Sequence, residues 1–225
     1  MEGNYVISFQ ANETISAMSV NPYKIVSDFE EAIAEYAGSK YAVAVESCTA
    51  AIFLSLMYRK QTGWRGSDKL GVGIQKHTYP GVACSIIHAG FKVRFEDDNW
   101  RGEYELEPMD IWDAALRFKK GMYHGGFQCL SFHIKKLLPI GRGGMILTDD
   151  EAAYKWLKKA RFDGREPVPL QEDNFTMLGC NMYMQPADAA RGLQLLQALG
   201  DRELDDLSVE SQKYADLSRF DIYKQ

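Results

Sequence analysis

The fold is decided by residues 131–150, which read SFHIKKLLPIGRGGMILTDD. An apolar run ending at Phe132 leads into a basic loop, and a glycine-rich turn leads into a second apolar run, Met145 to Thr148. This pattern predicts a strand, a loop and a second strand. A lysine held among apolar neighbours at a strand end loses hydration, which favours the uncharged amine that can attack a carbonyl. The stretch therefore predicts either a reactive lysine or two ordinary surface lysines, Lys135 and Lys136.

The composition fits a globular protein with a substantial hydrophobic core. The chain has 225 residues, of which 46% are hydrophobic and 25% charged, and these are ordinary values for a folded domain. A net charge of −5 argues against a nucleic-acid-binding platform, which usually presents a basic face. The chain has no run of about 18 apolar residues, and residues 1–4, MEGN, do not resemble a signal sequence. We therefore expect a cytoplasmic protein that binds neither nucleic acid nor membrane.

The cysteines predict neither a metal site nor a disulfide framework. They are scattered along the chain, and no two of them form a C-x-x-C pair: Cys48, Cys84, Cys129 and Cys180. Structural zinc sites and disulfide-rich domains both show regular cysteine spacing. We therefore expect reduced cysteines and no bound metal.

Helices alternate with short apolar strands along most of the chain. The first predicted helix covers residues 28–37, with Ser27 or Asp28 as N-cap and Gly38 as C-cap. The further predicted elements are strands at 41–45, 70–75 and 91–97 and helices at 82–88, 151–162 and 204–217. This alternation predicts an α/β fold with a mostly parallel sheet flanked by helices, and ligands at the C-terminal strand ends. One basic group is interpreted as a solvated helix face: Lys155, Lys158, Lys159 and Arg161.

A turn of small residues precedes the apolar helix that follows the strand 41–45. Its sequence is Glu46-Ser47-Cys48-Thr49. Such a turn leaves free backbone N–H groups and hydroxyls at a helix N-terminus, where the helix dipole favours an anion such as phosphate. The alternative is an ordinary serine cap with no ligand.

Three motifs resemble those of the DegT-type nucleotide-sugar aminotransferases, which are pyridoxal-phosphate enzymes with an aspartate-aminotransferase-like fold. The motifs are S-F-H-x-x-K with G-x-G-G at 131–144, the S-x-T turn at 47–49, and D-A-A at 113–115. The resemblance covers about residues 28 to 217. It implies that residues 1–225 form one large domain of the pyridoxal-phosphate transferase type, and that the second, smaller domain of full-length relatives is missing or vestigial.

The resemblance also implies roles for individual residues. Lys136, and not Lys135, falls on the Schiff-base position, and Asp113 falls on the aspartate that keeps the pyridine nitrogen protonated. Tyr79 matches the ring that stacks on the cofactor. The implied phosphate ligands are Ser47, Cys48, Thr49, Ser131 and, from the partner of a two-fold homodimer, Asn181. The implied cofactor is pyridoxal 5'-phosphate, the implied donor is glutamate, and the implied acceptor is a keto-sugar nucleotide.

The sequence departs from the family pattern at several points. Cys48 replaces a glycine, Leu116 replaces a polar residue, and the expected arginine near Asn181 is absent. Only residues 99–109 stand where the family has a further helix and strand. These departures leave a second hypothesis open, namely an inactive relative that serves as a binding or assembly subunit. A pyridoxal-phosphate dehydratase is disfavoured, because those relatives carry histidine in place of the lysine at 136.

Overall fold

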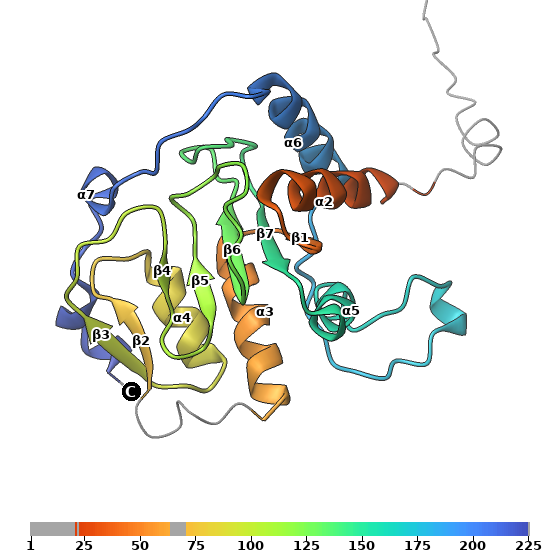
Figure 1. Ribbon diagram of the computed structural model, residues 1–225. Helices are drawn as coiled ribbons and strands as arrows, with labels where there is room; N and C mark the ends of the chain where they lie inside the picture. The colour runs from red at the N-terminus through yellow and green to blue at the C-terminus, as the bar shows by residue number, and fades with distance from the viewer. Residues whose placement is uncertain (1–20, 22, 64–70, 225) are drawn as a thin grey trace, which may run out of the picture.

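A computed structural model describes residues 21, 23–63 and 71–224 (Figure 1). A five-stranded sheet has the order β1-β7-β6-β5-β4, and β2 and β3 form a two-stranded sheet beside it. Two backbone hydrogen bonds of 2.8 and 3.0 Å between Gly73 and Glu107 join the two sheets. The strands are β1 (Tyr41–Val45), β2 (Val72–Gln75), β3 (Val93–Glu96), β4 (Tyr104–Glu105), β5 (Ile111–Asp113), β6 (Phe127–Ser131) and β7 (Gly144–Thr148). The start of the predicted strand 70–75, at Leu70, lies outside the described residues.

The sheet is mixed, although most of its strands point the same way. β5 pairs with β6 in parallel, as β2 does with β3, whereas the pairs β1–β7, β6–β7 and β4–β5 are antiparallel. The bridge between Gly73 and Glu107 is also antiparallel. Among the strands of the described residues, only β4 and β7 therefore run against the common direction. The α/β fold with flanking helices is confirmed, and the carboxyl ends of β1, β2, β5 and β6 meet at one edge.

The short connection between β3 and β5 explains the reversed strand β4. Parallel neighbours need a crossover of a dozen or more residues, usually containing a helix. Residues 99–109 are too few for a helix and a full strand, so the chain turns back and pairs β4 with β5 in antiparallel register, with Tyr104 opposite Asp113. Trp100, Tyr104 and Leu106 from this connection are buried in the core. The sheet is thus rewired at this point.

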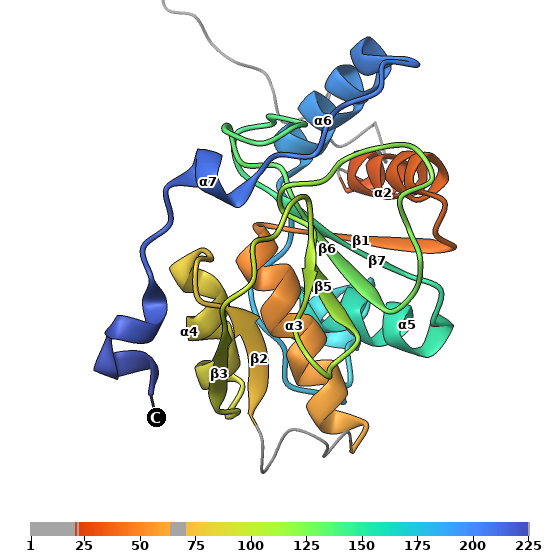
Figure 2. The same cartoon turned by 60° about the vertical axis from the view of Figure 1, so that its left-hand side comes forward.

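Helices cover both faces of the sheet (Figures 1 and 2). One face packs against α3, α4 and α5, and the other against α2 and α6. Side chains of β1 alternate accordingly, with Val43 and Val45 on the α3 side and Ala42 and Ala44 on the α2 side. The helices are α2 (Lys24–Ala37), α3 (Cys48–Gln61), α4 (Pro80–His88), α5 (Glu151–Ala160), α6 (Pro186–Leu199) and α7 (Val209–Gln212).

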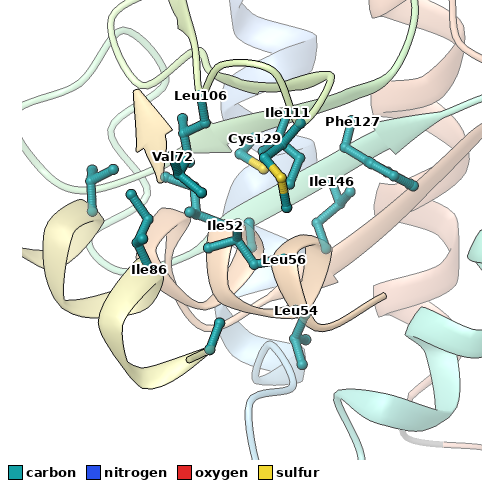
Figure 3. Packing of buried hydrophobic residues seen from close by; sticks show 14 of the residues in the cluster. Ile52, Leu54, Leu56, Val72, Ile86, Leu106, Ile111, Phe127, Cys129 and Ile146 are labelled. Carbon is teal, nitrogen blue, oxygen red and sulfur yellow. The ribbon is translucent and has the colours of Figure 1, made fainter. Parts of the chain in front are cut away.

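Figure 3 shows the larger of the two cores, where Ile52 and Leu56 of α3 face Ile111, Cys129 and Ile146 of the sheet. These five side chains are at most 1% exposed. A strand that is buried on both faces reads as a continuous apolar run, as β7 does. This core fixes α3 against the sheet, and thereby fixes the place of its N-terminus. Within the described residues, no helix has the length and apolar character needed to cross a bilayer.

The first helix begins earlier than predicted. It starts at Lys24 with Tyr23 as N-cap, and no side chain caps it, so the expected cap at Ser27 or Asp28 is wrong. Asp28 instead lies one turn inside the helix and accepts a hydrogen bond of 2.6 Å from Lys24. The predicted C-cap is confirmed, because Gly38 adopts a left-handed conformation with φ of 85°.

The basic group of α5 is not a uniformly solvated face. Arg161 is only 8% exposed and pairs with Glu30 of α2, which is 4% exposed. Lys158 lies 2.6 Å from the other oxygen of the Glu30 carboxylate. Only Lys155 keeps the predicted exposed position, where it pairs with Glu151. The prediction failed because helical spacing in α5 cannot reveal an acidic partner on a distant helix.

The predicted helix 204–217 is wrong. Only the four residues of α7 are helical there, and the chain otherwise runs extended along the molecule (Figure 2). Its backbone groups bond to other segments: the N–H of Leu207 donates to Leu116 at 2.9 Å, and that of Leu217 to Lys76 at 2.9 Å. These bonds take the place of intrahelical ones, so tertiary contacts override the helical pattern.

Candidate active site

A pocket of about 300 Å³ opens at the edge where the parallel strands end. Every predicted site residue except Asn181 lines it: Ser47, Cys48, Thr49, Tyr79, Asp113, Ser131 and Lys136. They come from segments far apart in the sequence and meet because β1, β2, β5 and β6 end on the same side. In the described ranges, no group of three or more histidine, cysteine or acidic residues is placed to hold a metal ion.

Lys136 projects into the pocket from the loop that follows β6. Its backbone N–H donates to the His133 carbonyl at 2.8 Å, and this bond closes a turn in the loop. The Lys136 side chain is half-buried. Its Nζ atom donates to the Tyr214 hydroxyl at 3.2 Å and to Gln212 Oε1 at 3.3 Å. Burial lowers the pKa of Lys136, while the nearby Asp113 and Cys48 oppose that shift. The amine is therefore more often uncharged than that of a free lysine. Lys135, the alternative, is exposed.

Asp113 forms the floor of the same pocket at the end of β5. Its Oδ1 atom accepts the Ala115 N–H at 3.1 Å and contacts Cys48 Sγ at 3.8 Å. The residue is 3% exposed, and burial raises its pKa, against the opposing effects of the Ala115 hydrogen bond and the Lys136 charge. Asp113 closes a turn at the end of β5 and caps no helix of the described residues.

The N-terminus of α3 forms one wall of the pocket. Ser47 is its N-cap and accepts the Ala50 N–H at 3.1 Å, as the turn predicts. Cys48 is the first helical residue and is not among the described non-glycine residues with positive φ, so its Cβ causes no backbone strain. Its Sγ turns inward to the Cys129 carbonyl at 3.3 Å. Burial holds the pKa of Cys48 well above its usual value, so the thiol stays protonated.

Gly144 allows β7 to approach this helix N-terminus. A Cβ at position 144 would lie 2.4 Å from the Ser47 carbonyl carbon and 2.6 Å from the Cys48 nitrogen. Backbone atoms cannot move aside as a side-chain end can. We expect Gly144→Ala to lower the free energy of unfolding by about 1–3 kcal/mol, measured by urea denaturation. Ala152→Ser is the control, because Ala152 is exposed on α5 and surface substitutions usually change the free energy of unfolding by no more than about 0.5 kcal/mol. Equal stability of Gly144→Ala and wild type would contradict this account.

Three other predicted site residues differ in their placement. Tyr79 directly precedes α4 and is 56% exposed, and its ring centroid lies 6.4 Å from that of Tyr214 in an edge contact. Ser131 ends β6 at the pocket wall. Asn181 is exposed and lies outside this pocket, where its side chain donates to Asp163 at 2.9 Å. The structure thus brings seven of the eight predicted residues together within one chain.

The comparison with known proteins agrees with this arrangement. The sequence model of the DegT/DnrJ/EryC1/StrS aminotransferase family matches residues 7–121 and 112–206. The chain belongs to this family. The matched residues include Ser47 at the N-terminus of α3 and Lys136 in the lysine loop.

Two curated DegT-family relatives are similar to most of the chain. The spore coat polysaccharide biosynthesis protein SpsC of Bacillus subtilis is 27% identical over 86% of this chain and 62% of its own length. The GDP-perosamine synthase of Caulobacter vibrioides is 25% identical over 87% of this chain and 62% of its own length. The chain thus spans less than two thirds of the length of these relatives.

A solved structure shares the fold. AtS13 from Actinomadura melliaura superimposes with a TM-score of 0.65, at 17% identity, over 79% of this chain and 61% of that one. The chain therefore shares the fold of this solved structure.

Sequence reasoning missed several residues that line this pocket, and three of them come from segments that no motif marked. Trp100 comes from the shortened connection, and Gln212 and Tyr214 come from the segment predicted as a helix. No local pattern marks them, because their position depends on how residues 99–109 and the C-terminal segment cross the sheet edge. Trp100 is held by a hydrogen bond of 3.0 Å from its Nε1 to the His77 carbonyl.

Proposed function

We propose that this chain binds pyridoxal 5'-phosphate through Lys136 and transfers an amino group, with glutamate as donor, to a keto-sugar nucleotide. The observation that supports the proposal is the half-buried amine of Lys136 in the pocket whose floor is the buried carboxylate of Asp113. The names of curated relatives, such as GDP-perosamine synthase, point to the same class of acceptor.

The residues present fit the cofactor. The α3 N-terminus offers unpaired backbone N–H groups together with the hydroxyls of Ser47 and Thr49, a donor set suited to a phosphate. Asp113 places a buried carboxyl group in the pocket, which suits a ring nitrogen that carries a proton. Burial lowers the pKa of the Lys136 amine, which suits reaction with an aldehyde. Pyridoxal phosphate, when bound, supplies an electron-withdrawing ring that stabilises negative charge at the reacting carbon.

Each residue would then have a distinct task. The Asp113 carboxylate would hold a proton on the ring nitrogen, and Lys136 would take a proton from the substrate carbon and return it. Tyr79 would stack on the ring, which contributes about 0.5–1.5 kcal/mol beyond burial. Apolar side chains of Ile52, Val82 and others in the pocket would exclude water. We propose a homodimer in which Asn181 completes the phosphate site of the partner, consistent with its place outside its own pocket.

The proposal is tested by titrating the purified chain with pyridoxal 5'-phosphate. We expect new absorbance in the visible or near-ultraviolet and, after borohydride treatment, a cofactor-sized mass increase on the peptide containing Lys136. Amino transfer from glutamate to keto-sugar nucleotides is then assayed separately, because binding a cofactor is not turnover. A chain that takes up no cofactor would refute the proposal and support the alternative, a binding or assembly subunit.

A further inference from the structure

The chain after α6 forms one wall of the pocket through Gln212 and Tyr214. We call residues 206–217 the strap. At its start, Asp206 Oδ2 accepts hydrogen bonds of 3.1 and 2.9 Å from Arg117. The backbone of Leu207 accepts from Gly102 at 3.0 Å and donates to Leu116 at 2.9 Å. The strap is therefore fastened beside the end of β5.

The other end of the strap is fastened beside the end of β2. Leu217 is 2% exposed, and its N–H donates to the Lys76 carbonyl at 2.9 Å. His77 forms a backbone bridge with Asp216, and its Nδ1 atom lies 3.2 Å from the Tyr214 carbonyl oxygen. These contacts involve residues that follow β2, whereas Asp206 and Leu207 contact residues that follow β5, so the strap is fixed at both ends. Gln212 and Tyr214, which line the pocket, lie between the two ends.

Between its two fastened ends, the strap presents two side chains to Lys136. The Tyr214 hydroxyl and the Gln212 carbonyl oxygen lie 3.2 and 3.3 Å from Nζ, and the Tyr214 ring centroid lies 5.9 Å from it. Lys213, between them, adopts a left-handed φ of 52°. That conformation is uncommon for a residue with a side chain, and here it accompanies the turn from α7 that brings residues on either side to the same amine.

We propose that the strap completes the lysine pocket within the same chain, and that Tyr214 and Gln212 are positioning residues that hold the Lys136 amine toward the pocket. The inference rests on the proposed function of Lys136. Neither side chain is needed to fasten the strap, because the bonds that fasten it involve Asp206, Leu207 and Leu217. An amine loses N–H groups when it forms a C=N bond with an aldehyde. In that state Nζ could no longer donate hydrogen bonds to both Tyr214 and Gln212.

The test measures the reactivity of Lys136 in the cofactor-free chain. The wild type, Tyr214→Phe and Gln212→Ala are labelled with trace acetic anhydride, and the extent at Lys136 is read by mass spectrometry relative to Lys40, which is exposed and does not line the pocket. Loss of one hydrogen bond to the amine is expected to raise relative labelling roughly two- to tenfold. Tyr223→Phe is the matched control, since Tyr223 does not line the pocket. Unchanged labelling in both pocket variants would overturn the proposal.

Hydrogen exchange on the same variants separates positioning from detachment. We expect the amides of residues 206–217 to keep their wild-type protection in Tyr214→Phe, because their bonds to other segments remain. Raised labelling together with lost protection would mean that the strap has come away, and this result would overturn the positioning role. Since neither measurement uses cofactor, failure of this inference is distinguishable from failure of cofactor binding.

Discussion

Lys136→Ala is expected to abolish capture of pyridoxal phosphate as a borohydride-stable adduct and to slow amino transfer by at least about 100-fold. The reason is that this substitution removes both the amine that would bond the aldehyde and the group that would move the proton. Lys135→Ala is the comparison, because Lys135 is the adjacent lysine and also lines the pocket, but its side chain is exposed and bonds neither Tyr214 nor Gln212 among the hydrogen bonds of the described residues. The measurement is the mass of the peptide after borohydride treatment, together with the rate of amino transfer.

The pH dependence of adduct formation gives a second readout of the same residue. Burial lowers the pKa of Lys136 from the ordinary value of 10.5. Because only the uncharged amine reacts, the rate of adduct formation should rise with pH and level off below pH 10.5. Adduct formation that survives Lys136→Ala but is lost in Lys135→Ala would show that the family alignment is displaced by one residue.

Glu30→Ala is expected to lower the free energy of unfolding by about 3–5 kcal/mol, the usual cost of removing one partner of a buried ion pair. Glu30 is 4% exposed and joins three elements. Its Oε1 atom accepts the Ala44 N–H of β1 at 2.8 Å and pairs with Arg161 beyond α5, while Oε2 lies 2.6 Å from Lys158. Alanine would leave the buried Arg161 guanidinium without its carboxylate.

The control for this prediction is the next residue on the same helix. Glu31 is exposed, so Glu31→Ala should change the free energy of unfolding by no more than about 0.5 kcal/mol. Glu30→Gln adds a second comparison, because it keeps the side-chain shape and removes the charge. Urea denaturation followed by circular dichroism measures all three variants. A Glu30→Ala variant as stable as Glu31→Ala would show that the buried pair contributes nothing.

Local sequence patterns determined the framework of the site. The apolar runs around the lysine loop predicted β6 and β7, which pair in antiparallel register. The S-x-T turn predicted the capped N-terminus of α3, where Ser47 accepts the Ala50 N–H. These features depend on residues within a few positions of one another, so a single sequence is enough to predict them. The family motifs then predicted that Lys136 and Asp113 belong to one site. The distance between them in the sequence does not indicate this.

Only the tertiary structure decided the features that join distant segments. The burial of Arg161 against Glu30 and the course of the strap past Lys136 depend on partners 131 and 78 positions apart in the sequence. The reversal of β4 depends on its place in the sheet, where it pairs with β5 and the residues after it bridge to β2. Residues 204–217 show why: their periodicity favours a helix, yet hydrogen bonds to Leu116 and Lys76 satisfy the backbone in an extended course. The long-range contacts stabilise the extended course by more than helix propensity would stabilise a helix in this segment. A local sequence pattern indicates only the helix propensity.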